Sequence, residues 1–147
     1  MKLPTKALYA TRAILDLALH SGEGLIQLKD IAKRQEVSEP YLEQLMIPLR
    51  RAGLIVSVRG ARGGHQLARH PSDITLADVV HATEGSVSFV ECVDDPSVCS
   101  RSPSCALRKA WEQSVETFKA SLSSLNFQKL AEEQMQMVTD ETTMYYI

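Results

Sequence analysis

The chain has 147 residues, of which 44% are hydrophobic and 23% charged, as is typical of a globular protein with one domain or one domain and an appendage. No apolar run approaches the roughly 18 residues of a membrane-spanning helix, and the N-terminus lacks a signal-peptide pattern. These features predict a cytoplasmic protein without a membrane partner. No His/Cys or carboxylate pair has a spacing typical of a catalytic cleft, which argues against an enzyme.

Charge is distributed unevenly along the chain. Residues 1–70 hold 11 lysines and arginines against 6 acidic residues, a net charge of +5, whereas residues 71–147 hold 5 against 12, a net charge of −7. Because DNA phosphates attract basic surfaces, this asymmetry indicates that only the first half touches nucleic acid. The net charge of −2 for the whole chain conceals the basic half.

The first predicted element is a helix over residues 5–21, where apolar residues recur at helical spacing. Arg12 and Asp16 lie four residues apart, which predicts an ion pair on the surface opposite the apolar stripe. Lys6 and Tyr9, near the start of the helix, are candidates to hold a DNA phosphate. A solvated lysine beside a half-buried tyrosine is the open alternative.

A helix-turn-helix pattern follows. Residues 28–35 predict a short amphipathic helix, and after a turn at residues 35–37 a second helix runs from Ser38 to about Ala52. Ser38 suits an N-cap, Pro40 falls in the first turn, and Gly53 closes the helix. One face of the second helix is apolar, formed by Leu42, Leu45, Met46 and Leu49.

Two short strands over residues 54–58 and 65–68 are joined by a basic, glycine-rich tip, Arg59-Gly60-Ala61-Arg62-Gly63-Gly64. Two helices followed by such a hairpin predict a winged helix-turn-helix. Its second helix suits a DNA major groove, and the hairpin tip suits the minor groove, because glycine permits close backbone approach. The alternative is a small helical domain with an exposed basic loop.

Three cysteines, Cys92, Cys99 and Cys105, lie in or beside a predicted loop over residues 86–104. The loop follows a helix over residues 76–83, opened by a capping box at Thr75 and Asp78. An odd number of cysteines argues against a disulfide framework, and the wide spacing favours an iron–sulfur cluster over a structural zinc site. Three reduced cysteines without metal remain the alternative.

From Ala106 a second long helical pattern begins, and its apolar residues recur at heptad-like steps: Leu107, Trp111, Val115, Phe118, Leu122 and Leu125. A seam of this kind predicts a homodimerisation helix that packs antiparallel to, or across, its copy. Packing on its own domain alone is the alternative. A last helix over residues 127–137 is expected to fold back onto the core or the partner, and the tail, residues 139–147, has no predicted structure.

Together these patterns predict a mainly α fold with a small β-hairpin wing, a winged helix-turn-helix plus a long dimerisation helix. The predicted parts are a DNA-binding domain over residues 1–84, a cluster-binding loop over residues 85–105, and a dimerisation helix with a C-terminal helix and tail over residues 106–147.

Several stretches resemble the iron–sulfur winged-helix transcriptional regulators of the IscR/NsrR type, and the first half is most similar to the cluster-biogenesis branch. The resemblance covers roughly residues 1–137 and rests on Lys2–Lys6 with Tyr9-Ala10, Asp16–His20, Tyr41–Gln44, Ser57–Gly60 with Gly63-Gly64, and the three cysteines. It implies a bacterial homodimer that binds a roughly palindromic DNA operator and regulates cluster biogenesis. It also implies an iron–sulfur cluster on the cysteines, [2Fe-2S] rather than [4Fe-4S], whose loss alters operator affinity.

The resemblance also implies roles for individual residues. Tyr41, Glu43 and Gln44 would face the bases from the second helix, where Ser38 caps the DNA-facing end and Arg50 neighbours a phosphate. The wing would contribute Arg59, Gly60, Arg62, Gly63 and Gly64.

Three departures from the family pattern bear on these roles. The biogenesis branch has a histidine ligand three residues after its third cysteine, where this chain has Arg108, and the nitric-oxide branch can use an acidic ligand where this chain has Leu8. The fourth ligand is therefore unknown, and the candidates are Glu91, Asp94, Asp95, Ser100, Ser104 or a residue of the partner. Pro40 also replaces a base-contacting serine, so operator preference need not transfer. The competing functions are a nitric-oxide-sensing [4Fe-4S] regulator and a cluster-free regulator gated by thiol oxidation or a partner protein.

Overall fold

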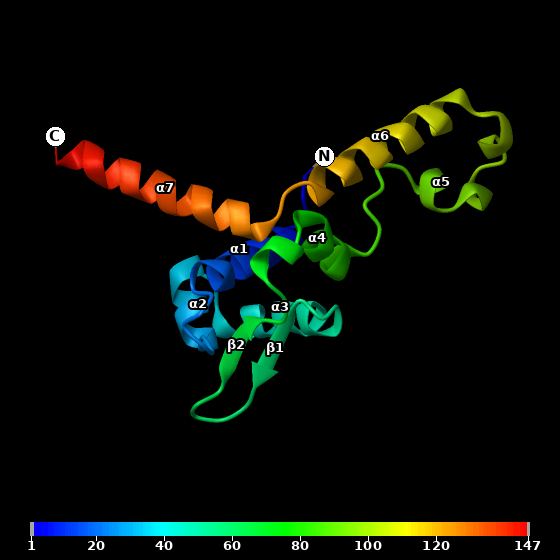
Figure 1. Ribbon diagram of the computed structural model, residues 1–147. Helices are drawn as coiled ribbons and strands as arrows, with labels where there is room; N and C mark the ends of the chain where they lie inside the picture. The colour runs from blue at the N-terminus through cyan, green and yellow to red at the C-terminus, as the bar shows by residue number, and fades with distance from the viewer. Residues whose placement is uncertain (1, 147) are drawn as a thin grey trace.

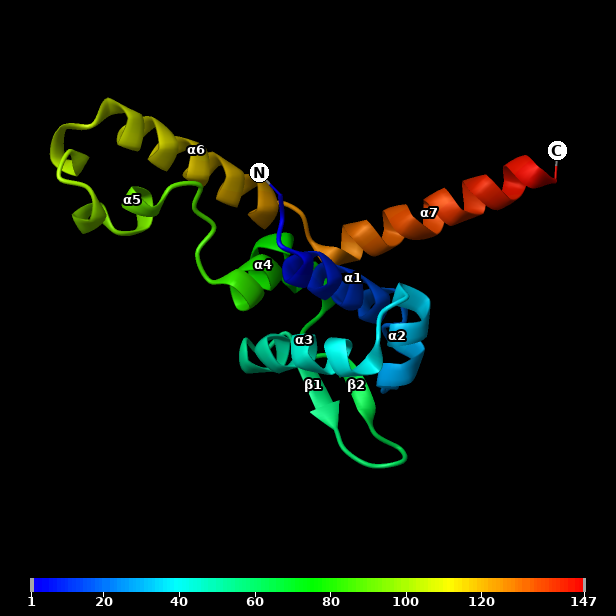
Figure 2. The same cartoon turned by 180° about the vertical axis from the view of Figure 1, so that it is seen from behind.

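The computed structural model describes residues 2–146, so Met1 and Ile147 lie outside the described residues. A body of four helices carries a hairpin on its lower side, and two long helices project from it in opposite directions (Figure 1; Figure 2 shows the reverse side). The elements of the body are α1 (Thr5–Leu19), α2 (Leu28–Gln35), α3 (Glu39–Arg51), β1 (Ile55–Val58), β2 (Gly64–Leu67) and α4 (Leu76–Glu84). The predicted mainly α fold with a small hairpin wing is confirmed.

Helices α2 and α3 form the predicted helix-turn-helix. Glu36 ends α2 in a left-handed conformation, with a φ of 55°, which turns the chain sharply toward α3. Ser38 caps α3, because its hydroxyl accepts a hydrogen bond from the backbone N–H of Tyr41 at 3.3 Å. The predicted apolar face is buried against the body, with Leu42, Leu45, Met46 and Leu49 all at most 2% exposed.

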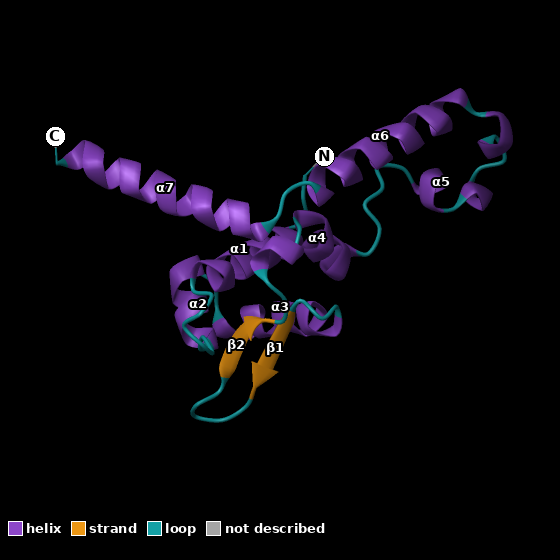
Figure 3. Cartoon of the chain, viewed as in Figure 1, coloured by secondary structure: helices purple, strands orange, loops and turns teal. Residues whose placement is uncertain are grey.

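The hairpin is a two-stranded antiparallel sheet in which Ile55 lies opposite Leu67 and Val58 opposite Gly64 (orange in Figure 3). Ile26, in the loop before α2, adds an isolated antiparallel bridge to β2, because its backbone N–H and carbonyl both bond to those of His65 at 2.8 Å. This bridge anchors the base of the wing to the body, while residues 59–62 at its tip are exposed.

An ion pair between exposed Arg34 and buried Asp16 ties α1 to α2. The guanidinium of Arg34 donates two hydrogen bonds to the Asp16 carboxylate, at 2.7 and 2.9 Å, and Asp16 is only 2% exposed. The predicted surface pair between Arg12 and Asp16 is therefore wrong. Asp16 faces the interior and α2, and Arg12 instead donates hydrogen bonds to Gln35.

Helix α4 has the predicted capping box, with reciprocal bonds between Thr75 and Asp78, and it ends at Gly85. The predicted loop over residues 86–104 is only partly a loop. It contains the short helix α5 (Glu91–Asp94) and the 3-10 turns η2 (Pro96–Val98) and η3 (Ser102–Ser104). Such single turns are too short to produce a periodic apolar pattern, which is why the sequence did not indicate them.

The two projecting helices are α6 (Ala106–Ser123) and α7 (Phe127–Tyr145). The expected end of the last helix at residue 137 is wrong, because α7 continues through most of the tail to Tyr145; Ile147, the last residue of that tail, lies outside the described part. Residues 138–145 contain neither glycine nor proline to stop the helix. Only the first turns fold back on the body, through buried Phe127 and Ala131. Within residues 2–146, no helix has the length and apolarity needed to cross a bilayer.

Candidate nucleic-acid interface and cysteine loop

The outer face of α3 is accessible. Glu43 and Gln44 are exposed, whereas Leu42 and Leu45 on either side of them are buried, so the body holds α3 by its inner face alone. Ser38 and Arg50, at the two ends of the helix, are also exposed, and Tyr41 is half-buried. The structure thus brings the predicted α3 residues together on one accessible side, a geometry that suits a helix inserted in a groove.

Tyr9 of α1 packs against the first turn of α3. Its ring meets that of Tyr41 edge-to-face, with centroids 5.9 Å apart, and the guanidinium carbon of Arg12 lies 5.1 Å from the Tyr9 ring centre. Tyr9 is therefore half-buried between α1 and α3, while Lys6, one turn earlier in α1, is exposed. Arg12 supports this corner of the interface, and the sequence analysis missed it because it paired Arg12 with Asp16.

The wing tip presents its two arginines to solvent. Arg59 and Arg62 are exposed, and the tip is closed by a hydrogen bond from the N–H of Gly63 to the carbonyl of Gly60 at 2.9 Å. A hollow of about 310 Å³ separates the wing from the starts of α2 and α3 and is lined by Gly60, Gly63, Lys29 and Glu39, among others. The tip and the exposed start of α3 therefore flank one concave surface.

Two glycines let the wing fold tightly. A Cβ on Gly63 would overlap the carbonyl oxygen of Val58 and lie 2.8 Å from the carbonyl carbon of Arg59. A Cβ on Gly64 would lie 2.6 Å from the carbonyl oxygen of Ile26. Close backbone approach thus accounts for both positions, and the wing needs these glycines for its own shape.

His65 lies in strand β2 of the wing, at 7% exposure, with its Nδ1 2.7 Å from the hydroxyl of Ser57 on β1. Burial lowers the pKa of His65, and Arg50 lowers it further, against an opposing effect of Glu43. The neutral imidazole is therefore the form that fits the folded wing.

We expect protonation of His65 to destabilise the fold. Because its pKa is lower when folded than unfolded, its stabilising contribution is complete above the ordinary histidine pKa of about 6.5. That contribution decreases as the pH falls below this value and is lost once the pH passes the lower pKa of the folded state. Urea denaturation between pH 8 and 5 should show the loss, and His65→Gln should reduce the pH dependence. Identical pH profiles for the two proteins would contradict this role.

The three cysteines lie at the far end of α6, away from the body (Figure 1). Cys92 is in α5, Cys99 follows η2, and Cys105 caps α6, where its sulfur accepts a hydrogen bond from the N–H of Arg108 at 3.4 Å. All three are partly exposed and unpaired as thiols. Cys105 thus lies at the positive end of a helix dipole, where negative charge is favoured.

Arg108, in the first turn of α6, contacts the cysteine loop at Cys92 and Cys105. Its Nε–H donates a hydrogen bond to the carbonyl of Cys92 at 2.8 Å, and its guanidinium lies 3.7 Å from a carboxylate oxygen of Glu112. A hollow of about 400 Å³ beside Arg108 is lined by Cys99 and Ser102, among others. Arg108 holds the loop against α6, but a guanidinium cannot be a metal ligand.

The donor set suits an iron–sulfur cluster in its chemistry, because three thiols on one loop are the ligands that such clusters take. The thiols do not converge on a point: within residues 2–146 no group of three or more His, Cys, Asp or Glu side chains is arranged to hold a single metal ion. Of the candidate fourth ligands, Asp95 already accepts hydrogen bonds from the Ser97 side chain and backbone, which lower its pKa.

Comparison with known proteins places these features in a family. The pattern of Rrf2, described as an iron-dependent transcriptional regulator, matches residues 3–133, which spans both the helix-turn-helix and the cysteine loop. The chain belongs to the Rrf2 family. Rrf2 proteins are transcriptional regulators and not enzymes, in agreement with the sequence analysis.

Individual Rrf2 relatives are similar over nearly their whole length. The chain is 44% identical to Protein rrf2 of Nitratidesulfovibrio vulgaris over 132 residues, which are 90% of this chain and 86% of that protein. It is 39% identical to the HTH-type transcriptional regulator CymR of Bacillus subtilis over 100% of both chains.

Solved structures agree with the winged-helix fold. The IscR of T. potens matches with a TM-score of 0.74 and 40% identity, over 91% of this chain and 88% of that chain. The structure of CymR, the global cysteine regulator of B. subtilis, matches with a TM-score of 0.75 and 38% identity, over 90% of this chain and 98% of that chain. The Rrf2 relatives of this chain thus include both IscR and CymR proteins, and the family alone does not decide how its cysteines are used.

Proposed function

We propose that this Rrf2 protein is a cytoplasmic homodimer that binds a roughly palindromic DNA operator, with α3 in the major groove and the wing tip in the minor groove. The accessible face of α3 carries the proposal, because Glu43 and Gln44 are exposed between buried neighbours and lie on the side free of the body. In this arrangement Lys6, Tyr9 and Arg50 approach phosphates, and Ser38, Tyr41, Glu43 and Gln44 face the bases.

The cysteine loop is the control element of the proposed function. Cys92, Cys99 and Cys105 would hold an iron–sulfur cluster, [2Fe-2S] in preference to [4Fe-4S], with the fourth ligand unassigned. A cluster supplies a redox-sensitive, labile inorganic centre, and the chain supplies its position at the tip of α6, next to the proposed dimer seam. The IscR relatives support regulation of cluster biogenesis as the role.

Anaerobic purification tests the cluster. The isolated protein is expected to be brown, to contain iron and sulfide, and to give a Mössbauer spectrum of the bound cluster. A variant with all three cysteines changed to alanine should fold but remain colourless, since the loop lies outside the core. Colourless wild-type protein, unchanged by reconstitution with iron and sulfide, would refute this part of the proposal.

Arg108 favours a second candidate, a cluster-free regulator gated by thiol oxidation. It stands where the biogenesis branch has its histidine ligand, and it is engaged with the Cys92 carbonyl instead. This candidate predicts operator binding that is insensitive to an iron chelator and changed by peroxide. The cluster proposal predicts a change with the chelator, so one pair of titrations separates the two.

Substitutions on α3 and on the wing should affect DNA binding differently. Gln44→Ala is expected to reduce discrimination between operator and random duplex by about 1–3 kcal/mol, because it removes a side chain suited to a bidentate adenine contact. Arg59→Ala should weaken both duplexes and flatten the salt dependence by about one unit, because it removes a phosphate contact. Fluorescence anisotropy over a range of salt concentrations measures both effects. Equal losses on the two duplexes for Gln44→Ala would remove it from base recognition.

A further inference from the structure

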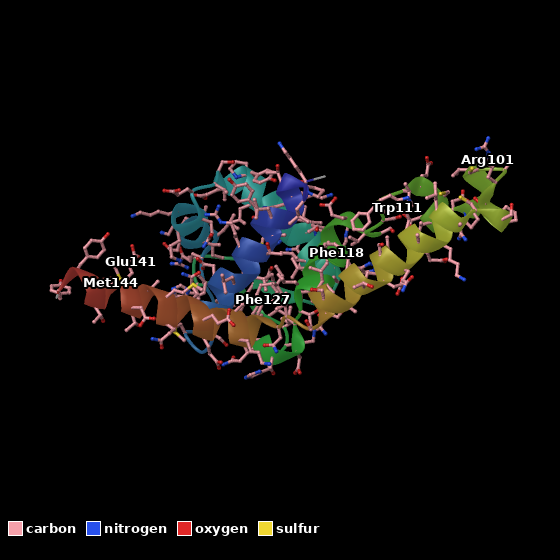
Figure 4. All side chains as sticks on the ribbon, turned by 90° about the horizontal axis from the view of Figure 1, so that it is seen from above. Arg101, Trp111, Phe118, Phe127, Glu141 and Met144 are labelled. Carbon is pink, nitrogen blue, oxygen red and sulfur yellow. The ribbon has the colours of Figure 1, made fainter. Side chains whose placement is uncertain are left out.

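Helix α6 has two unlike halves. Its apolar seam is uncovered in the N-terminal half, where Leu107 is 71% and Trp111 44% exposed. Farther along, Val115 is only 1% exposed and Phe118 packs on Phe89 with ring centroids 5.7 Å apart. Figure 4 shows this difference, with Phe118 next to the body and Trp111 farther out along α6 toward the cysteine loop.

The covered half borders two largely apolar hollows. One, of about 500 Å³, lies between α4, the N-terminal segment and Phe118, and it is lined by Leu3, Pro4, Val80, Glu84 and Phe89, among others. The other, of about 580 Å³, lies between α4 and α6 and is lined by Ala77, Asp78, His81, Lys119 and Leu122, among others. Each is large enough for a bulky side chain.

The first hollow contains a polar atom that lacks a partner. One carboxylate oxygen of Glu84, Oε1, is buried and accepts no hydrogen bond from any described residue. A buried acceptor without a partner is unfavourable, and an indole N–H, which usually finds a partner when buried, is a suitable donor for it. The exposed Trp111 carries the one indole of the chain.

We propose that Trp111 of one protomer fills the first hollow, between α4, the N-terminal segment and Phe118, of a second copy and donates its indole N–H to Glu84 there. The inference rests on the proposed homodimer and names the contact that holds it together. Because a two-fold interface places the same surfaces on both sides, each protomer inserts its own Trp111 and receives the other.

This contact requires antiparallel packing of the two α6 helices. A two-fold arrangement with parallel helices would place Trp111 against Trp111 and leave both hollows open. In the antiparallel arrangement the uncovered N-terminal half of one α6 lies on the hollow-lined half of the other, so the heptad-like seam is covered along its length.

Charge agrees with the same pairing. The first turns of α6 carry Arg108 and Lys109, whereas α4, which walls both hollows, carries Asp78 and Glu84 and neither lysine nor arginine; the basic residues that line the hollows, Lys2 and Lys119, come from the N-terminal segment and from α6. The helix dipoles add to the attraction, because the positive N-terminal end of one α6 would approach the negative C-terminal end of the partner α4.

Sedimentation equilibrium of the full chain tests the contact. Trp111→Ala is expected to raise the dimer dissociation constant about 30-fold, as for a central aromatic anchor. Trp111→Phe and Glu84→Met should each raise it about tenfold, and the double variant also about tenfold, since the first change already removes the shared hydrogen bond. Val56→Ala, an exposed apolar position on the wing, is the control and should leave the constant unchanged.

Tryptophan fluorescence gives a second readout, because the chain has one tryptophan. Emission should shift to longer wavelength on dilution from dimer to monomer, and wavelength is read rather than intensity because a bound cluster would quench the latter. A dimer whose dissociation constant and emission do not respond to these changes would overturn the Trp111 contact and leave the proposed homodimer standing. A chain that stays monomeric at all concentrations would overturn both.

Discussion

Asp16→Ala is expected to lower the free energy of unfolding by about 2–3 kcal/mol. Removing one partner of a buried ion pair leaves the other uncompensated, which typically costs about 3–5 kcal/mol. We expect less here because the Arg34 side chain is 38% exposed and regains water. Gln35 also loses a hydrogen bond to Asp16, of 3.0 Å, so α2 loses two of its attachments to α1.

Urea denaturation followed by circular dichroism measures this effect. Asp73→Ala is the matched control, because Asp73 is exposed and should change the free energy by no more than about 0.5 kcal/mol. A loss below about 1 kcal/mol for Asp16→Ala would show that the ion pair does not fasten the helix-turn-helix to the rest of the body.

Gly63→Ala is expected to weaken operator binding about tenfold or more while leaving the body folded. The added Cβ would overlap the Val58 carbonyl oxygen, so the tip must open, and strain of this kind is worth about 1–3 kcal/mol. Opening the tip would displace Arg59 and Arg62, the two arginines that the tip presents to solvent. The wing tip contributes nothing to the buried core, so the melting temperature should change little.

Ala61→Ser, two residues before Gly63 and exposed, is the control for this change and should bind as the wild type does. Anisotropy titrations with labelled duplex measure both variants. Wild-type affinity for Gly63→Ala would mean that the wing does not reach DNA, and the proposed interface would then rest on α3 alone.

Local signals predicted most of the DNA-binding half. The Ser38 cap and the Thr75–Asp78 capping box are decided by residues three positions apart, and both are present as expected. The hairpin followed from its glycine-rich tip in the same way. These features depend on neighbours in the chain, and a sequence displays neighbours directly.

Contacts between distant residues were less predictable. Helical spacing favours Arg12 as the partner of Asp16, and the choice of Arg34 instead depends on how α2 packs on α1. The packing of Tyr9 on Tyr41 joins residues 32 positions apart. The C-terminal end of α7 was predicted wrongly for a different reason. The last turns of α7 have few contacts with the body, and no capping residue lies at residue 137, where the helix was expected to end.

The candidate site divides in the same way. The spacing of Cys92, Cys99 and Cys105 predicts a control element from the sequence alone, and that role stays a prediction. The hydrogen bond from Arg108, on α6, to the Cys92 carbonyl appears only in three dimensions, and so does the Glu84 oxygen buried without a partner. The Arg108 contact bears on how the cysteine loop is attached to α6, and the Glu84 oxygen bears on the proposed dimer contact.

In vitro selection from a library of random duplexes, with the purified full chain, tests the central claim most directly, because it asks at once whether the protein reads DNA and whether two copies read it together. The account predicts enrichment of an inverted repeat whose half-sites are about one helical turn, roughly 10 base pairs, or a multiple of it apart. It also predicts that Gln44→Ala relaxes the enriched half-site. Recovery of unenriched sequence, or of a single half-site without its inverted copy, would contradict it.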